Sequence, residues 1–232
     1  MIEARKRHGK LRWRERWQLA RRLRPSHYGR CYVLPNSAKS ALVPFLAGIP
    51  ERIGHHGEAR YWLINRRRVS GPRERPMVEF YADLAFEPGH EAEQAPDPLL
   101  ARDASRERAA RERQGLQANE PLILLCPGAE YGPAKRWPAA HFAALAKSLA
   151  AQGCAIWLFG SPKDHAVAEE ISQLAPGLCR NLCGATSLAQ AVDLLAMAEL
   201  VVCNDSGLMH VAAALDRPLV TLYGSSSPGF TP

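Results

Sequence analysis

The sequence predicts an α/β fold in which helices cover both faces of a parallel sheet. From Pro121 onward, short apolar runs typical of strands alternate with longer segments of helical periodicity. The stretch 200–215 shows the repeating unit, since a β-branched apolar run is followed by a polar turn at 204–207 and a helix of small residues. The chain has 232 residues and is 47% hydrophobic, which is enough for one large or two small domains.

The first third of the chain predicts a smaller set of elements. Helices are expected at 12–24, where Pro25 ends the pattern, at 38–47, where Gly48 ends it, and at 76–86. A buried strand is expected at 30–34 and another strand at 51–54. Residues 87–98 are rich in proline, glycine and acids, which is typical of a linker. Residues 101–115 read either as a charged helix or as an extension of that linker.

The second half predicts a regular alternation of strands and helices. Pro138 at the first position of a helix and Gly153 after its end are typical helix boundaries. Strands are expected at 122–126, 154–159, 178–182, 200–203 and 218–223, and helices at 138–152, from the turn at 160–162 to 174, at 187–198 and at 208–215. We therefore predict domains at 1–86 and 119–232, joined by a linker at 87–118.

The positive charge is concentrated at one end of the chain. Residues 1–30 hold eleven lysines and arginines against two glutamates, which exceeds the net charge of +7 for the whole chain. Within the helix at 12–24, Trp13, Trp17 and Ala20 share one face. This pattern favours a helix that packs its tryptophan face on a sheet, with membrane-surface or RNA binding as alternatives. If residues 5–24 bind a partner, we expect an anionic membrane surface and no nucleic acid.

Several classes of protein and site are not indicated. No apolar run is long enough to span a bilayer, and no signal peptide is recognised. The six cysteines form no Cys-x-x-Cys pair, and Cys179 and Cys183 have no histidine at zinc spacing, so we expect no metal and no cofactor. The motifs for Walker-type, dinucleotide, nucleophile-elbow and zinc-protease sites are also not found.

Three loops follow strands of the second half, at 127–137, 160–164 and 204–207, and the carboxyl edge of a parallel sheet is where ligands bind. A lysine such as Lys135 facing a helix that begins near Gly207 could hold a diphosphate without a metal. The alternative is that Lys135 and Arg136 form surface ion pairs and the turn only caps its helix. Asp164 could bind ribose hydroxyls or cap the next helix.

These residues resemble the bacterial ADP-heptose:lipopolysaccharide heptosyltransferases. Two motifs are specific: Pro127-Gly-Ala-Glu-Tyr-Gly-Pro-Ala-Lys-Arg-Trp-Pro138 and Asn204-Asp-Ser-Gly-Leu-Met-His-Val-Ala-Ala-Ala-Leu215. Further matches lie at 34–45, 47–50, 179–182 and 222–228. The resemblance implies a GT-B fold of two Rossmann-like domains with parallel sheets, the first on the acceptor side and the second on the donor side, both incomplete here. It also implies an inverting, metal-independent transfer of L-glycero-D-manno-heptose from ADP-heptose to the heptose/Kdo inner core.

The resemblance also implies roles for individual residues. Lys135 would contact the donor phosphates. Asp164 is a donor-site candidate on a different ground, its place after a strand. The other donor-site residues would be Glu130 and Tyr131 near the sugar phosphate, Thr186 near the nucleotide, and Asp205, Ser206, Gly207 and His210 at the helix turn. The acceptor-side candidates are Asn36, Ser37 and Lys39.

The chain departs from the family pattern at both ends. The family's first strand and glycine loop, which carry the proposed general base, have no match, and the family continues beyond Pro232. We therefore assign no catalytic base, and we expect this chain by itself to bind ADP-type donors weakly and to transfer no heptose. The alternatives are an inactive ADP-sugar-binding fragment and a basic protein that binds anionic surfaces. The expected location is cytoplasmic, with a peripheral contact at the inner membrane.

Overall fold

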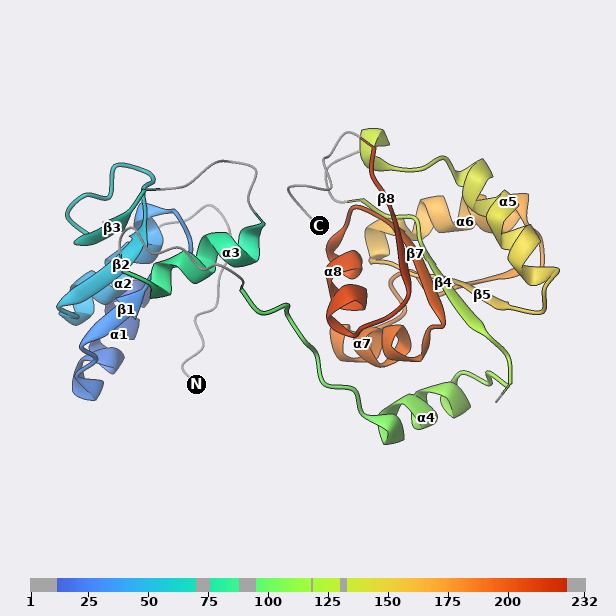
Figure 1. Cartoon of the computed structure of the whole chain (residues 1–232), viewed down its shortest axis with the longest axis horizontal. Coiled ribbons are helices and arrows are strands. Elements are labelled where there is room, and N and C mark those ends of the chain that lie inside the picture. The colour runs from blue at the N-terminus through green and yellow to red at the C-terminus, as the bar shows by residue number, and fades with distance from the viewer. Residues whose placement is uncertain (1–11, 70–75, 88–94, 118, 130–132, 225–232) are drawn as a thin grey trace. The chain divides into compact units, whose positions relative to one another are not determined.

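The chain forms two compact units that meet in sequence between Pro96 and Asp97 (Figure 1). The structure is a computed structural model, and it describes residues 12–69, 76–87, 95–117, 119–129 and 133–224. Among these residues, no helix has the length and apolar character needed to cross a bilayer.

The first unit has a parallel sheet with the strand order β1-β2-β3. Helix α2 has the bounds that the sequence predicts: Ser37 accepts a hydrogen bond from Ser40 N at its start, and Gly48, at φ 77°, ends it. The elements are α1 (Trp13–Leu23), η1 (Arg24–Ser26), β1 (Arg30–Tyr32), α2 (Ala38–Ala47), β2 (Glu51–His55), β3 (Arg66–Arg68), α3 (Met77–Ala82) and η2 (Asp83–Ala85).

Helix α1 forms within the predicted range 12–24, but it does not have the packing that its sequence favoured. Trp13 and Trp17 are 51% and 43% exposed, so the expectation that they pack on a sheet is wrong. The helix instead contacts α2 through Ala20, which is 1% exposed and allows a close approach to Ala47. Arg16 Nη1 also donates to Lys39 O of α2 over 2.6 Å. The face that Ala20 shares with the two tryptophans is therefore buried only near the end of the helix.

The strands of this unit also differ from expectation. Strand β1 was expected to be buried, but Arg30 and Tyr32 are exposed because β1 lies at an edge of the sheet. Strand β3 consists of three arginines and was not predicted, because it has none of the apolar alternation that marks a strand. Its pairing with β2 from Ile53 to His55 makes it a strand, and that is a tertiary interaction.

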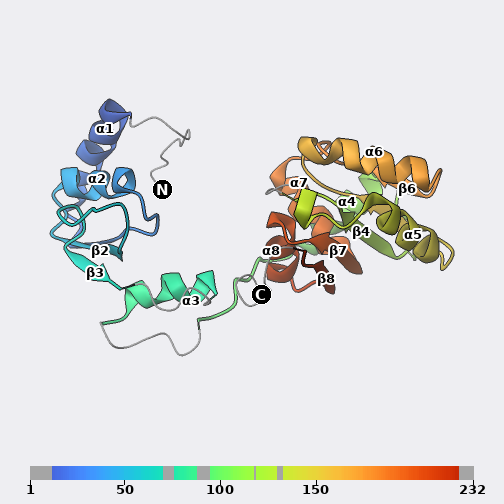
Figure 2. The same ribbon diagram turned by 90° about the horizontal axis from the view of Figure 1, so that it is seen from above.

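The second unit has a five-stranded parallel sheet with the order β6-β5-β4-β7-β8. Helices α5 and α6 cover one face, and α4, α7 and α8 pack on the other. Figure 2 shows α5 and α6 side by side, on the side of this unit away from α8 and β8. The strands and helices predicted in this half are confirmed with small shifts at their ends. The elements are α4 (Ala104–Arg113), β4 (Leu122–Cys126), η3 (Pro133–Lys135), α5 (Ala139–Ala150), β5 (Ala155–Leu158), η4 (Pro162–Asp164), α6 (His165–Leu174), β6 (Cys179–Asn181), α7 (Leu188–Met197), β7 (Leu200–Asn204), α8 (Gly207–Ala214) and β8 (Leu219–Leu222).

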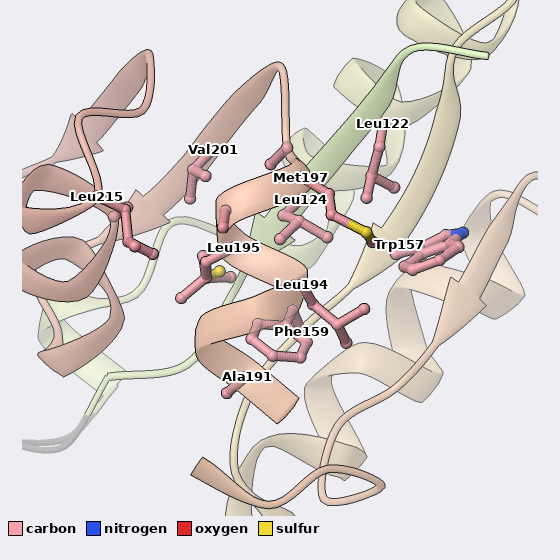
Figure 3. Close-up of a cluster of buried hydrophobic side chains, with 14 of the residues drawn as sticks. Leu122, Leu124, Trp157, Phe159, Ala191, Leu194, Leu195, Met197, Val201 and Leu215 are labelled. Atoms are coloured by element: carbon pink, nitrogen blue, oxygen red, sulfur yellow. The ribbon is translucent and has the colours of Figure 1, made fainter. Parts of the chain in front are cut away.

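Strand β4 supplies both halves of the core of this unit. Its side chains alternate, so that Leu122 and Leu124 pack toward α7 while Ile123 and Leu125 pack toward α5 and α6. Figure 3 shows the first of these clusters, in which side chains of α7 contact those of β4, β5 and β7. All five residues of β4 are buried, as expected for the central strand of a doubly covered sheet.

Helix α4 lies within the range predicted as a linker, but it packs on the second unit. Ala110 and Leu116, 6% and 8% exposed, join the core cluster that contains α7. Arg106 also forms an ion pair with Asp193 of α7, with 3.2 Å between Nη2 and Oδ2. The part of the predicted linker after Asp97 therefore belongs to the second unit.

Candidate functional site

The site lies at the carboxyl ends of β4, β5 and β7, and Asn204 ties two of its loops together. Asn204 ends β7 and is fully buried. Its Nδ2 donates to Pro127 O over 2.8 Å, and its Oδ1 accepts from Trp137 N over 3.0 Å. One side-chain amide thus fixes both ends of the loop at 127–137 against the turn that precedes α8. Sequence reasoning treated Asn204 only as a turn residue.

Lys135 reaches the turn before α8 through an ion pair with Asp205. The distance from Lys135 Nζ to Asp205 Oδ2 is 2.7 Å, and the two side chains are 20% and 8% exposed. The pair is therefore partly shielded from water, unlike the surface ion pair of the alternative interpretation. The lysine faces the start of a helix, as expected from the sequence, while its contact with donor phosphates stays a prediction.

The start of α8 is open to a ligand. Ser206 precedes the helix but makes no capping hydrogen bond through its side chain. A Cβ atom placed on Gly207 would meet nothing within 4 Å, so the backbone here borders free space. Free N–H groups and the helix dipole favour an anion at such a position.

A pocket of about 500 Å³ adjoins this helix start. It contains two cationic side chains, Arg136 and Lys163, and the Nε of Arg136 is buried without a hydrogen-bond partner among the described residues. Lys163 was not singled out from the sequence, although it lies in a loop at the end of a strand. The pocket is lined by Cys126, Gly128, Ala129, Arg136, Phe159, Gly160, Ser161, Pro162, Lys163, Asp164, Thr186, Ser187, Leu188, Ala191, Ser206, Gly207, Leu208 and Val211.

Asp164 lines this pocket and also caps a helix. Its Oδ2 accepts from Ser161 N over 2.9 Å and from Ser161 Oγ over 2.7 Å, which forms the capping box of η4. Gly128 is needed beside it, because a Cβ atom there would overlap the Asp164 carboxyl group. The capping role expected as one alternative is present, and ribose binding stays a prediction.

The remaining donor-side candidates are distributed unevenly. Thr186, Ser206 and Gly207 line the pocket, whereas Lys135 and Asp205 lie at its side and are not lining residues. His210 is an exposed residue of α8 and does not line the pocket either. Glu130 and Tyr131 lie outside the described residues.

The acceptor-side candidates lie in the first unit, around the start of α2. Ser37 caps α2, and Asn36 Oδ1 accepts from Arg60 Nη2 over 3.2 Å. Lys39 lies in the first turn of α2, where its carbonyl accepts from Arg16. The structure therefore groups these three residues, and their role toward an acceptor stays a prediction.

The thiols near the pocket are not nucleophiles. Burial raises the pKa of Cys126 well above its usual range, and burial together with the nearby Asp164 carboxylate raises the pKa of Cys183 to about 12. Burial also raises the pKa of Cys203 to about 11. These groups stay protonated near neutral pH. Within the described ranges, no cluster of three or more His, Cys, Asp or Glu side chains could hold a metal ion.

Comparison with known proteins agrees with this geometry. Residues 16–232 match the model of glycosyltransferase family 9 (heptosyltransferase). The chain is 51% identical over 236 residues to lipopolysaccharide heptosyltransferase 2 of Escherichia coli K12, covering 97% of this chain and 68% of that protein. The structure of E. coli ADP-heptose LPS heptosyltransferase II is similar, with a TM-score of 0.85, 48% identity, and coverage of 94% of this chain and 69% of that one.

A second solved structure is that of E. coli heptosyltransferase WaaC with ADP, which is 27% identical. Its TM-score is 0.62, and the match covers 94% of this chain and 69% of that one. Both units of the present chain have the parallel sheets and α/β order of the GT-B glycosyltransferases. The chain therefore belongs to glycosyltransferase family 9, the heptosyltransferases, and is a glycosyltransferase.

Proposed function

We propose that this chain transfers L-glycero-D-manno-heptose from ADP-heptose to the heptose/Kdo inner core of lipopolysaccharide, and that the pocket beside α8 holds the donor. The observation that carries the site assignment is the position of Lys135, 2.7 Å from Asp205 at the open start of α8. The family and the 51% identity to a lipopolysaccharide heptosyltransferase support the substrate class.

The site has groups that can balance the negative charge of the diphosphate without a metal ion. The N–H groups at the start of α8 would donate to the phosphate oxygens, and Lys135 and Arg136 would neutralise their charge. During transfer, an acceptor hydroxyl oxygen bonds to the anomeric carbon while the bond to the phosphate oxygen breaks, and ADP leaves with the extra negative charge. Hydrogen-bond donors that are fixed in place before the reaction stabilise that charge as it develops. We assign no residue as the base that takes the hydroxyl proton.

A transfer assay tests the proposal. The full chain is incubated with ADP-heptose and a Kdo-bearing core that already carries one heptose, with and without EDTA. The family match favours transfer over the expectation from the sequence that this chain alone transfers no heptose. We therefore expect ADP release and a product that is heavier by one heptose, at the same rate in both. Absence of transfer together with intact ADP binding would support the inactive-fragment alternative. Absence of ADP binding would contradict the donor-site assignment.

We also propose that the chain works in the cytoplasm, in peripheral contact with the anionic inner membrane through α1. Trp13 and Trp17 are exposed on α1 together with Arg14, Arg21 and Arg22. Exposed tryptophans with arginines are typical of helices that lie at a membrane interface. The chain's partners would then be ADP-heptose, the lipopolysaccharide core and an anionic lipid surface, with no nucleic acid.

Replacing Trp13 and Trp17 with alanine is expected to weaken sedimentation with anionic liposomes, by ~10-fold in the partition coefficient, because each ring loses apolar contact with the interface. The matched control is Trp62→Ala, which removes a side chain that is 86% exposed between β2 and β3, outside α1. Duplex DNA at the same salt concentration serves as the competing ligand. Tighter binding to DNA than to liposomes would contradict the proposal.

A further inference from the structure

Arg60 is a buried arginine that joins the carboxyl ends of β1 and β2. It is 4% exposed. Its Nη2 donates to His55 O over 2.7 Å, at the end of β2, and its Nη1 donates to Pro35 O over 2.6 Å, in the loop after β1. The same guanidinium donates from Nη2 to Asn36 Oδ1 over 3.2 Å. A planar group with five donors is suited to holding several oxygens in one arrangement.

The loop that carries Arg60 is held against the loop at 35–37 by further contacts. Glu58 Oε2 accepts from Ala38 N over 2.9 Å, at the start of α2. A Cβ atom on Gly57 would be 2.8 Å from Asn36 O, so the two backbones lie close together there. Glu58 and Ala59 have φ angles of 42° and 48°, which are unfavourable for residues with a Cβ atom. Such backbone strain persists only where surrounding contacts enforce it.

The contact with Arg60 fixes the orientation of the Asn36 side chain. A guanidinium can only donate, so it must meet the oxygen of the Asn36 amide, and the NH₂ group is turned away from it. Asn36 is exposed, and its NH₂ group donates to no other group in the described part of the chain. Two hydrogen-bond donors are therefore presented at the carboxyl edge of the first sheet, where ligands of α/β folds bind.

We propose that Asn36 binds an oxygen of the acceptor saccharide through its NH₂ group, and that Arg60 is the positioning residue that sets this amide. The inference rests on the proposed function, and it names the contact on the acceptor side. The hydrogen-bond partners of Arg60 named above are neutral oxygens, and the nearby Glu58 carboxylate offsets part of its charge. The two outward N–H groups of Asn36 suit any acceptor oxygen, of the hydroxyl, carboxylate or phosphate kind.

Asn36→Asp separates this role from a structural one. An aspartate keeps an oxygen toward Arg60 and adds charge to that contact, so the melting temperature should be unchanged or higher. It removes both outward donors and places a negative charge at the acceptor. We expect its Kd for a soluble, singly heptosylated Kdo-bearing core oligosaccharide to rise by at least ~10-fold, as for the loss of one hydrogen bond. Its Kd for ADP should equal that of the parent chain.

The matched control is Asn65→Asp in the same unit. Asn65 Oδ1 accepts from Arg52 N over 2.8 Å, and its Nδ2 donates to Pro50 O over 2.6 Å. Both polar groups of this amide are therefore used in hydrogen bonds to the backbone of the same unit. Its aspartate variant should melt earlier, because a carboxylate would face the Pro50 carbonyl, while its acceptor Kd stays at the parent value. Arg60→Lys keeps the positive charge but loses the planar guanidinium that binds several oxygens at once. It should raise the acceptor Kd and leave the ADP Kd unchanged.

Calorimetric binding distinguishes failure of this inference from failure of the proposed function. If Asn36→Asp binds the acceptor as tightly as the parent, or if its ADP affinity falls by the same factor, the inference is wrong even when the parent transfers heptose. A parent chain that binds ADP but not the acceptor would also overturn it. Acceptor binding that depends on Asn36 supports it, whether or not transfer is observed.

Discussion

Gly207→Val is expected to lower the affinity of the chain for ADP by ~100-fold, which corresponds to the loss of two hydrogen bonds to a charged group. Gly207 lines the pocket, and a Cβ atom placed on it would meet no atom of the surrounding elements within 4 Å. The valine side chain would therefore keep the phosphates away from the N–H groups at the start of α8. Since it fills only free space and valine has a higher helix propensity than glycine, the melting temperature should be unchanged or slightly higher.

Isothermal calorimetry with ADP measures this effect, and Gly29→Val is the matched control. A Cβ atom placed on Gly29 would likewise meet nothing within 4 Å, but Gly29 lies in the first unit, before β1. The control should bind ADP like the parent chain. If Gly207→Val also binds ADP with the parent affinity, the turn is purely structural and the donor lies elsewhere.

Much of the fold follows from local sequence signals, and the exceptions depend on tertiary contacts. Helix α2 could be predicted to the residue because Ser37 caps its start and Gly48 provides the left-handed residue at its end. Strand β3 could not be predicted, because Arg66–Arg68 has no apolar alternation and is a strand only through its pairing with β2. The packing of α1 was mispredicted for a related reason, because the contact of Ala20 with α2 is tertiary and leaves the tryptophans of the same face exposed.

In the candidate site, too, some features could be predicted from the sequence and others depend on tertiary contacts. The three loops could be located because the carboxyl ends of parallel strands share one edge, and the structure brings Lys135 to Asp205 across 70 positions of sequence. The tie made by Asn204 to the loop at 127–137 could not be predicted, since both of its partners are backbone atoms far away in the sequence. For the same reason, no pattern around Arg60 indicates that its guanidinium fixes Asn36.

Lys135→Ala is expected to cost about 1.5–3 kcal/mol of ADP binding free energy, because one charge-assisted contact to phosphate is lost. It should also lower the free energy of unfolding, since the Asp205 side chain is only 8% exposed and loses the ammonium 2.7 Å away. The two effects have different causes. Calorimetry with ADP measures the first, and urea unfolding without ligand measures the second.

A second substitution separates the two effects of Lys135→Ala. Adding Asp205→Asn to that variant removes the carboxylate that had lost its cation, so stability should recover in part while ADP affinity stays low. Lys147→Ala is the control for charge alone, because Lys147 is exposed on α5 and does not line the pocket. If the double variant regained the parent affinity for ADP, Lys135 would act only by neutralising Asp205. A folded Lys135→Ala chain that bound ADP like the parent would remove Lys135 from the donor site altogether.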